Sequence, residues 1–375
     1  MAYAYSPGLK VLESVSLQRD RRLPLSGKIL VSQGDNVSAE QVVMKTDMPG
    51  RADMMNIVSM LGCLPNEIEK YMKKKQGDSI KTHELIAESS SFFGLFKTRI
   101  ESPIDGTIES ISPVTGQLTL RGKPIPVEVK AYIDGTILST DGKEHVIVET
   151  TGSFIQGIFG VGGETCGNIE IAVESSDTPL TIDSLSENHK DKIVVGGSYV
   201  TYDVLMRAKE IGIKAIIVGG FDDSDLKKFL GFDLGVAITG QEKLGLTLII
   251  TEGFGEIPMA EKTFNLLRKF SGMRASVNGA TQIRAGVMRP EIIIPLQNAD
   301  KTTDESKTKL VLEVGKSVRV IREPFFGRLG IIKSLPAELT KLPTESMARV
   351  LEVEFENGER AVIPRANVEV IAMDG

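Results

Sequence analysis

The sequence predicts a multidomain protein in which β-rich modules flank a parallel α/β centre. Three observations lead to this fold class. A strand-and-turn pattern occurs twice near the N-terminus, apolar strands ending in glycine alternate with helical segments in the centre, and five short strands are predicted near the C-terminus. A chain of 375 residues is also too long for one ordinary core. We therefore expect three domains.

Composition and charge fit a globular protein without a strongly charged face. The net charge is −6 and charged residues make up 25% of the chain, with both signs spread along it. This balance does not favour nucleic acid as a partner. No apolar run has the length of about 20 residues that a bilayer-spanning helix needs, and residues 1–10 do not resemble a secretion leader. We expect a cytoplasmic protein with no membrane partner.

The first domain, residues 1–150, is predicted from two internal repeats. Gly34-Asp35-Asn36-Val37 recurs as Gly77-Asp78-Ser79-Ile80, and Asp105-Gly106-Thr107-Ile108 recurs as Asp134-Gly135-Thr136-Ile137. Glycine and aspartate flanked by β-branched residues are typical of tight turns between strands. Repeated units of this kind predict a small symmetric β-module. The apolar spacing at about 51–75 predicts a helical insertion in it.

This first domain resembles the barrel-sandwich hybrid fold of biotinyl and lipoyl carrier domains. Such carriers present a lysine between methionines at a hairpin tip. Here Met44-Lys45-Thr46 follows the first turn and lacks the second methionine. We interpret Lys45 as a solvated strand residue, so neither biotin nor lipoate is expected. The two cysteines and three histidines have no metal-binding spacing, so no metal is expected and the cofactors stay unknown.

A glycine-rich segment, 152–167, opens the predicted second domain, residues 151–300. Its glycine spacing does not match a dinucleotide-binding fingerprint, because Gly157, Gly160 and Gly162 are spaced differently. The segment is followed by a predicted strand. We interpret it as a tight β-hairpin or a domain hinge.

The remainder of the second domain is predicted to be a Rossmann-like parallel α/β domain. Strands that are apolar on both faces alternate with helices at 201–211, 222–230 and 258–270. Ligands of such sheets bind beyond the carboxyl ends of the strands. The candidate ligand-binding residues are Gly196, Gly197, Gly219, Gly220, Thr239, Gly240, Glu252, Gly253 and Arg284. Glycine at strand ends also serves packing alone, and this is the favoured interpretation.

The third domain, residues 310–375, alternates apolar and polar residues in short strands, which predicts an SH3-like barrel. Its segment 315–332, with Gly315, Pro324 and Gly330, resembles the KOW motif of ribosomal proteins and transcription-elongation factors. That resemblance implies contact with RNA, ribosome or RNA polymerase, although such barrels also dock proteins. The candidate contact residues are Arg319, Arg322, Phe325, Phe326, Arg328 and Lys333.

Two functional hypotheses follow from this organisation. No Ser/His/Asp, Cys/His or metal-binding set can be assembled from the sequence, which favours a non-enzymatic adaptor. Its partner would be a protein or ribonucleoprotein assembly, of transcription or translation, although net charge does not support binding to RNA itself. The alternative is a small-molecule or nucleotide-binding sensor or enzyme that uses the carboxyl-terminal edge of the central sheet.

Overall fold

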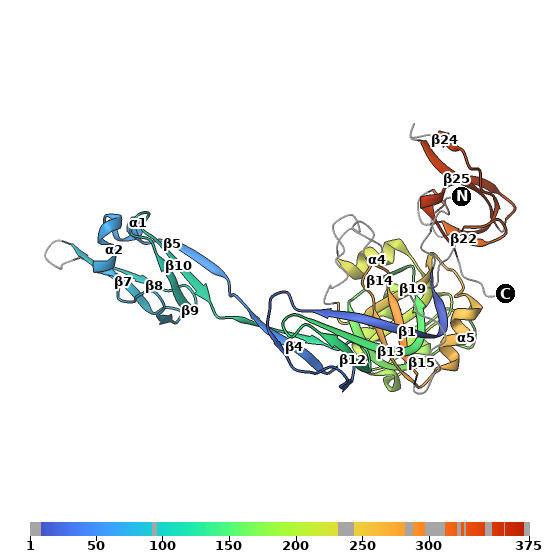
Figure 1. Cartoon of the computed structure of the whole chain (residues 1–375), viewed down its shortest axis with the longest axis horizontal. Helices are drawn as coiled ribbons and strands as arrows, with labels where there is room; N and C mark the ends of the chain where they lie inside the picture. The colour runs from blue at the N-terminus through green and yellow to red at the C-terminus, as the bar shows by residue number, and fades with distance from the viewer. Residues whose placement is uncertain are drawn as a thin grey trace.

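The computed structural model shows a mostly β protein with several lobes (Figure 1). It describes residues 9–91, 96–231, 244–281, 288–296, 312–320, 324–325, 328–341, 347–355 and 357–370. Among these residues, every helix is too short or too polar to cross a lipid bilayer.

An outer β-module lies next to the central part of the protein. Two of its strands, β4 and β11, pair with each other, and β13 pairs with both β1 and β12. Its core includes Leu17, Val43, Met44 and Val148, together with Ile293 from the central part. The outer module thus shares its core with its neighbour. Its strands are β1 (Val11–Arg22), β2 (Lys28–Ile29), β3 (Asn36–Val37), β4 (Val42–Met48), β11 (Ile125–Lys130), β12 (Gly135–Thr140) and β13 (His145–Gln156).

A second β-module, residues 52–122, is inserted between β4 and β11. It projects away from the remainder of the molecule (Figure 1). Its core is its own and includes Ile57, Ile86, Leu118 and Leu120. Its elements are β5 (Ala52–Asn56), α1 (Ile57–Leu61), η1 (Pro65–Glu67), α2 (Ile68–Tyr71), β6 (Ser79–Ile80), β7 (Leu85–Ser91), β8 (Phe96–Glu101), β9 (Gly106–Ile111) and β10 (Gln117–Gly122).

The inserted module has the same strand pairing as the outer module. Gly34 and Gly77 both have φ near 90°, and each is followed by a two-residue strand, β3 or β6. The N–H of Gly34 donates to Ile137 O, and the N–H of Gly77 donates to Ile108 O, at matching places of the repeat. The predicted repeat is therefore present in the backbone hydrogen bonds.

The two modules also share their strand register and the places where that register shifts. Met44 lies opposite Val129 in the outer module, as Ala87 lies opposite Ile100 in the inserted one, and both ladders shift by one residue just beyond. β9 and β12 carry the same shift against their partners β10 and β13. The sequence predicts one module with a helical insertion. The structure instead has two copies, one nested in the other, and the predicted helices belong to the second copy.

The repeated glycines Gly106 and Gly135 are required by a close approach of two backbones. A Cβ atom would lie 2.0 Å from Arg121 O at Gly106 and 2.2 Å from Glu149 O at Gly135. We predict that Gly106→Ala or Gly135→Ala lowers the free energy of unfolding by about 1–3 kcal/mol through overcrowding. Urea unfolding measures the effect. Gly122→Ala is the control, since its Cβ would lie 3.4 Å from Arg51 O, an ordinary contact. Equal stability of all three variants would contradict the prediction.

The central part, which we call the body, is a mixed sheet with helices on both faces. Parallel pairs join β15 to β16, β16 to β18 and β18 to β19, while β14, β20 and β21 pair antiparallel. The outer module extends this sheet through β13, which runs across the predicted boundary at residue 150. The strands are β14 (Phe159–Val161), β15 (Glu164–Ile171), β16 (Ile193–Val195), β17 (Tyr199–Val200), β18 (Ala215–Phe221), β19 (Thr247–Phe254), β20 (Arg274–Asn278) and β21 (Glu291–Pro295).

Two helices of the body, α3 and α4, begin and end where local sequence signals place them, whereas α5 begins at Glu261, later than the predicted start at 258. Thr201 caps α3, Asp222 caps α4, and Gly212 and Gly231 end these helices in the left-handed conformation. α3 and α4 pack into one core cluster and α5 packs into another. The helical elements are η2 (Ile182–Ser184), η3 (Glu187–His189), α3 (Tyr202–Ile211), α4 (Asp223–Leu230) and α5 (Glu261–Lys269).

The glycine-rich segment does not form the predicted hairpin. β14 lies within it but pairs antiparallel with β19, far along the chain. A Cβ at Gly157 would lie 2.8 Å from the side chain of Ile249, and one at Gly162 would lie 2.4 Å from Leu246 O. The glycines therefore allow β14 to lie against β19, a contact that local sequence does not reveal.

A separate six-stranded sheet forms the C-terminal part, which we call the C-terminal sheet. Its core includes Val318, Ile332, Val353 and Phe355. The strands are β22 (Ser317–Val320), β23 (Leu329–Ser334), β24 (Leu339–Lys341), β25 (Met347–Phe355), β26 (Arg360–Pro364) and β27 (Val368–Val370), with η5 (Arg365–Asn367) before the last.

Candidate functional site

The predicted ligand edge of the body is filled by the chain itself. At Gly197 a Cβ would lie 2.3 Å from Thr178 O, at Gly219 2.2 Å from Ile257 O, and at Gly220 2.0 Å from Gly255 O. At Gly196 a Cβ would lie 2.9 Å from the side chains of Leu180 and Val218. Gly253 of β19 lies opposite Gly220 of β18. Gly197, Gly219 and Gly220 therefore make room for the chain's own backbone and Gly196 makes room for side chains, in agreement with the packing interpretation.

The polar groups at this edge also have structural partners. Thr201 and Asp222 cap helices, and the hydroxyl of Ser198 donates to Asp177 O. The hydroxyl of Thr251 donates to Val218 O at 3.3 Å. Glu252 accepts a hydrogen bond from the N–H of Ala260 at 3.0 Å, at the start of α5. The other candidates of this edge, Thr239, Gly240 and Arg284, lie outside the described residues.

Glu252 also pairs with Arg319 of the C-terminal sheet. Arg319 Nη2 donates to the Glu252 carboxylate, and Arg319 Nη1 donates to Thr251 O at 3.2 Å. Glu369, on β27, lies 3.7 Å from Arg319 Nη1 and binds Arg289 through its second oxygen. The C-terminal sheet is therefore held against the carboxyl-terminal end of β19 by a network of two arginines and two glutamates.

This network is buried, which is costly for charged groups. Arg319 is 1% exposed and Glu369 is 0% exposed. Burial raises the pKa of Glu369 and lowers the pKa of Arg289, because the charged forms lose hydration. Among the described residues, the Nε atoms of Arg289 and Arg319 have no hydrogen-bond partner. Arg319 therefore does not offer a surface contact for a phosphate, contrary to the prediction from the KOW-like segment.

Two other candidate cations of that segment and its border, Arg328 and Lys333, are paired within the C-terminal sheet. The guanidinium of Arg328 stacks on Phe355, 3.8 Å from the ring centroid, and bonds Glu359 at 2.9 Å. Phe325 packs against Phe355, with 5.3 Å between the ring centroids, and Lys333 pairs with Glu354. Arg322 and Phe326 lie outside the described residues. These contacts support a packing role for Phe325 and Arg328.

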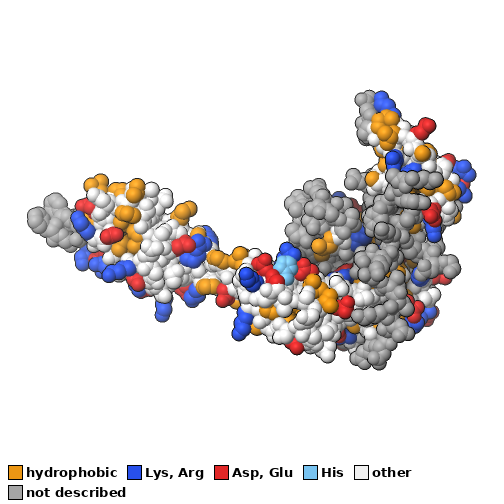
Figure 2. All heavy atoms as spheres, viewed as in Figure 1, with side chains coloured by type: hydrophobic (Ala, Val, Ile, Leu, Met, Phe, Trp, Pro, Cys, Tyr) orange, Lys and Arg blue, Asp and Glu red, His pale blue; other side chains and the backbone are white. Residues whose placement is uncertain are grey.

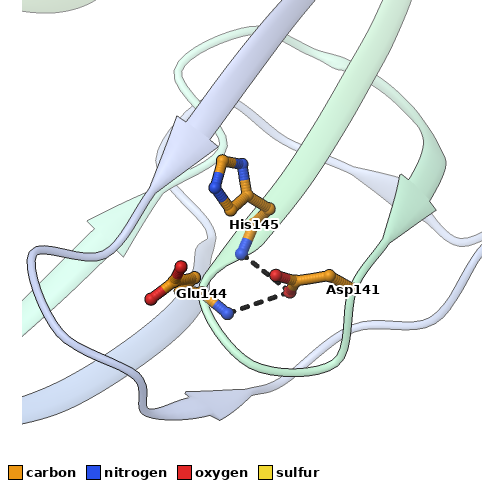
Figure 3. Close-up of side chains that lie close together, drawn as sticks. All are labelled: Asp141, Glu144 and His145. Carbon is orange, nitrogen blue, oxygen red and sulfur yellow. Dashed lines mark hydrogen bonds between the residues drawn. The ribbon is translucent and has the colours of Figure 1, made fainter.

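One cluster of metal-type ligands lies in the described residues, at the turn between β12 and β13 (Figure 3). It consists of Asp141, Glu144 and His145, which the sequence interpretation missed although they are close in the chain. Asp141 Oδ1 accepts hydrogen bonds from the N–H groups of Lys143, Glu144 and His145, at 2.8 to 2.9 Å. Asp141 therefore holds the turn, which is the ordinary use of aspartate in such loops.

The three backbone bonds lower the pKa of Asp141 to about 2. A lowered folded-state pKa stabilises the fold above the unfolded value of about 4, and that stabilisation is lost as pH falls through the folded value. We predict that Asp141→Asn removes this part of the pH dependence between about pH 4 and pH 2. Thermal unfolding of both proteins across this range measures it. Identical pH profiles would contradict this role of Asp141.

Lys45 lies in the middle of β4, with Lys28 opposite it on β2 and Glu128 opposite it on β11. It is exposed, as expected for an ordinary strand residue. The resemblance to carrier domains implies a lysine at a hairpin tip, which is not where Lys45 lies. Beside Lys45 is a shallow hollow of about 400 Å³, lined by Gly27, Lys28, Lys45, Thr46, Asp47, Pro126 and Glu128.

An exposed apolar group lies on the inserted module. Met54 of β5 is 75% exposed, Val114 at the β9–β10 turn is 83% exposed, and Leu64, just after α1, is 64% exposed. Met60 of α1 is also exposed. We call these four residues the apolar patch. Figure 2 shows apolar side chains gathered on the part of this module that carries α1 and β5. Sequence reasoning placed the helices here without identifying their exposed side chains.

Comparisons of the chain with protein-family models and with curated proteins give no match. The function is therefore inferred from the geometry described above.

Proposed function

We propose that the protein is a non-enzymatic adaptor that docks onto a larger assembly through its inserted module. The observation that carries this proposal is the inserted module itself. It has its own core, projects from the body, and presents the apolar patch (Figures 1 and 2). Exposed apolar groups are costly in water and commonly mark contact surfaces. Methionine side chains adapt readily to a partner's shape.

The placement of the polar groups in the body supports the same proposal. The described polar side chains at the predicted ligand edge cap helices, bond the backbone, or pair with the C-terminal sheet. This favours the adaptor over the alternative of a small-molecule sensor or enzyme with a Rossmann-like site. The resemblances to barrel-sandwich hybrids and to KOW-type, SH3-like barrels also fit docking modules. The KOW resemblance is the reason to propose an assembly of transcription or translation.

Affinity purification from cells with a patch variant tests the proposal. We expect the wild-type protein to retain a defined set of partners that Met54→Gln, Met60→Gln, Leu64→Gln and Val114→Thr together remove. The matched control changes Leu339→Gln, Met347→Gln and Val362→Thr, which alters exposed apolar residues of the C-terminal sheet. Partners retained by the patch variant, or lost equally in the control, would refute docking through this module.

A further inference from the structure

The inserted module is connected to the outer module by a two-stranded ribbon. Met48 lies opposite Ile125 at the end of the β4–β11 ladder, and Ala52 lies opposite Arg121 at the start of the β5–β10 ladder. Each strand advances four residues between these pairs, so the register is unchanged across the gap. The two halves of the ribbon nonetheless belong to different sheets.

In this gap, the regular alternation of residues whose backbone groups bond across the ribbon is interrupted. Val43 O accepts from the N–H of Leu30, the residue just after β2, and Lys45 lies opposite Lys28 of β2. The alternate residues of β4, which include Met48, therefore direct their backbone groups to β11. On the far side, Arg51 O accepts from the N–H of Gly122 at 2.8 Å. Met48 and Arg51 are three residues apart, whereas an uninterrupted ladder uses every second residue. The ladder must therefore break between them.

The residues at the break suit a joint. Because the register is the same on both sides of the gap, Pro49 lies opposite Pro124. Neither proline has an N–H to donate to a ladder. Gly50 lies at a close approach of the two strands, since its Cβ would be 2.2 Å from Gly122 O. The inserted module has a complete core of its own, so movement at this point would not expose apolar core residues.

We propose that Pro49, Gly50, Lys123 and Pro124 form a hinge on which the inserted module swings relative to the body. Hinges of this kind are a few residues at element ends that absorb changes in φ and ψ. A swinging arm lets one docking surface reach differently placed contacts on a large assembly. The hinge is independent of the adaptor proposal, because it concerns the free protein and is measured without a partner.

Distance distributions between spin labels test the hinge directly. One label replaces Val114 on the inserted module and the other replaces Ile182 on the body, both exposed positions, in a protein with Cys63 and Cys166 changed to serine. The reference pair, Val114 and His83, lies within the inserted module. We expect the distribution across the ribbon to be at least about twofold broader than the reference.

Substitutions at the joint locate the movement. Pro49→Gly together with Pro124→Gly should broaden the Val114–Ile182 distribution further, because glycine frees the φ angles that proline fixes. Pro103→Gly, an exposed proline of the inserted module outside the ribbon, should leave it unchanged. A wild-type distribution as narrow as the reference would overturn the hinge. A broad distribution that the joint variant does not alter would overturn its assignment to these four residues.

Discussion

Replacing Arg319 with alanine is expected to destabilise the C-terminal sheet and its contact with the body by about 3–5 kcal/mol. Arg319 is buried between Glu252 and Glu369, and it also bonds Thr251 O. Its removal leaves two buried carboxylates with less compensation, and Glu369 already has a raised pKa because of its burial. The large cost therefore comes from the charges left behind as well as from the bonds lost.

Urea unfolding followed by hydrogen exchange measures this effect and assigns it to a part of the chain. The variant should lose protection in the C-terminal sheet at lower urea than the wild type. Arg360→Ala is the matched control, since this arginine of the same sheet is 57% exposed and pairs at the surface with Glu354. Surface pairs contribute about 0–1 kcal/mol. Equal effects of the two substitutions would show that the buried network does not hold the sheet in place.

Replacing Leu118 with alanine is expected to cost about 2–5 kcal/mol in the stability of the inserted module alone. Leu118 is 0% exposed and lies in the core cluster that contains only residues of this module. Truncating it leaves a cavity with no connection to the core of the body. The loss should therefore be confined to residues 52–122.

Hydrogen exchange of this variant at low urea distinguishes local from global destabilisation. The strands of the inserted module should exchange faster, while β16, β18 and β19 keep their wild-type protection. Val146→Ala truncates the side chain at the corresponding place of the outer module. Its effect on hydrogen exchange should not be confined to one module. Val146 belongs to a core shared with Ile293 of the body, so protection should also fall in β21. Loss of protection in the body of the Leu118→Ala protein would contradict a separate core.

Local signals in the sequence account for much of the fold. The Gly-Asp turns, the caps at Thr201 and Asp222, and the left-handed Gly62 that ends α1 each act within a few residues of sequence. Such features depend on the φ angles of glycine and the hydrogen bonds of short polar side chains, which a sequence displays directly.

The sequence does not reveal that one module is nested in the other, because the corresponding edge strands differ in sequence. Arg19-Asp20-Arg21 on β1 corresponds to Asp53-Met54-Met55 on β5, so only the pairing with β13 and β10 reveals the match. In the outer module the two arginines bind Glu291 and Glu164 of the body. Among the described residues, the corresponding strand of the inserted module lies away from the body and carries other side chains there.

The candidate residues were predicted less well, because their partners lie far away in the sequence. Glu252 and Arg319 were placed in two different sites, one for a ligand and one for nucleic acid. They are 67 residues apart and bind each other. No local pattern shows such a contact, since burial and pairing of charges arise only when two domains pack together.

Excision of the inserted module tests the account most directly. Residues 49–124 are replaced by Asn-Gly, a two-residue turn that can close β4 and β11 because Met48 and Ile125 lie opposite each other. We predict that the shortened protein unfolds at the same temperature as the body of the wild type but retains none of the partners lost in the patch variant. A shortened protein that still binds those partners, or a body that no longer folds, would contradict a self-contained docking module.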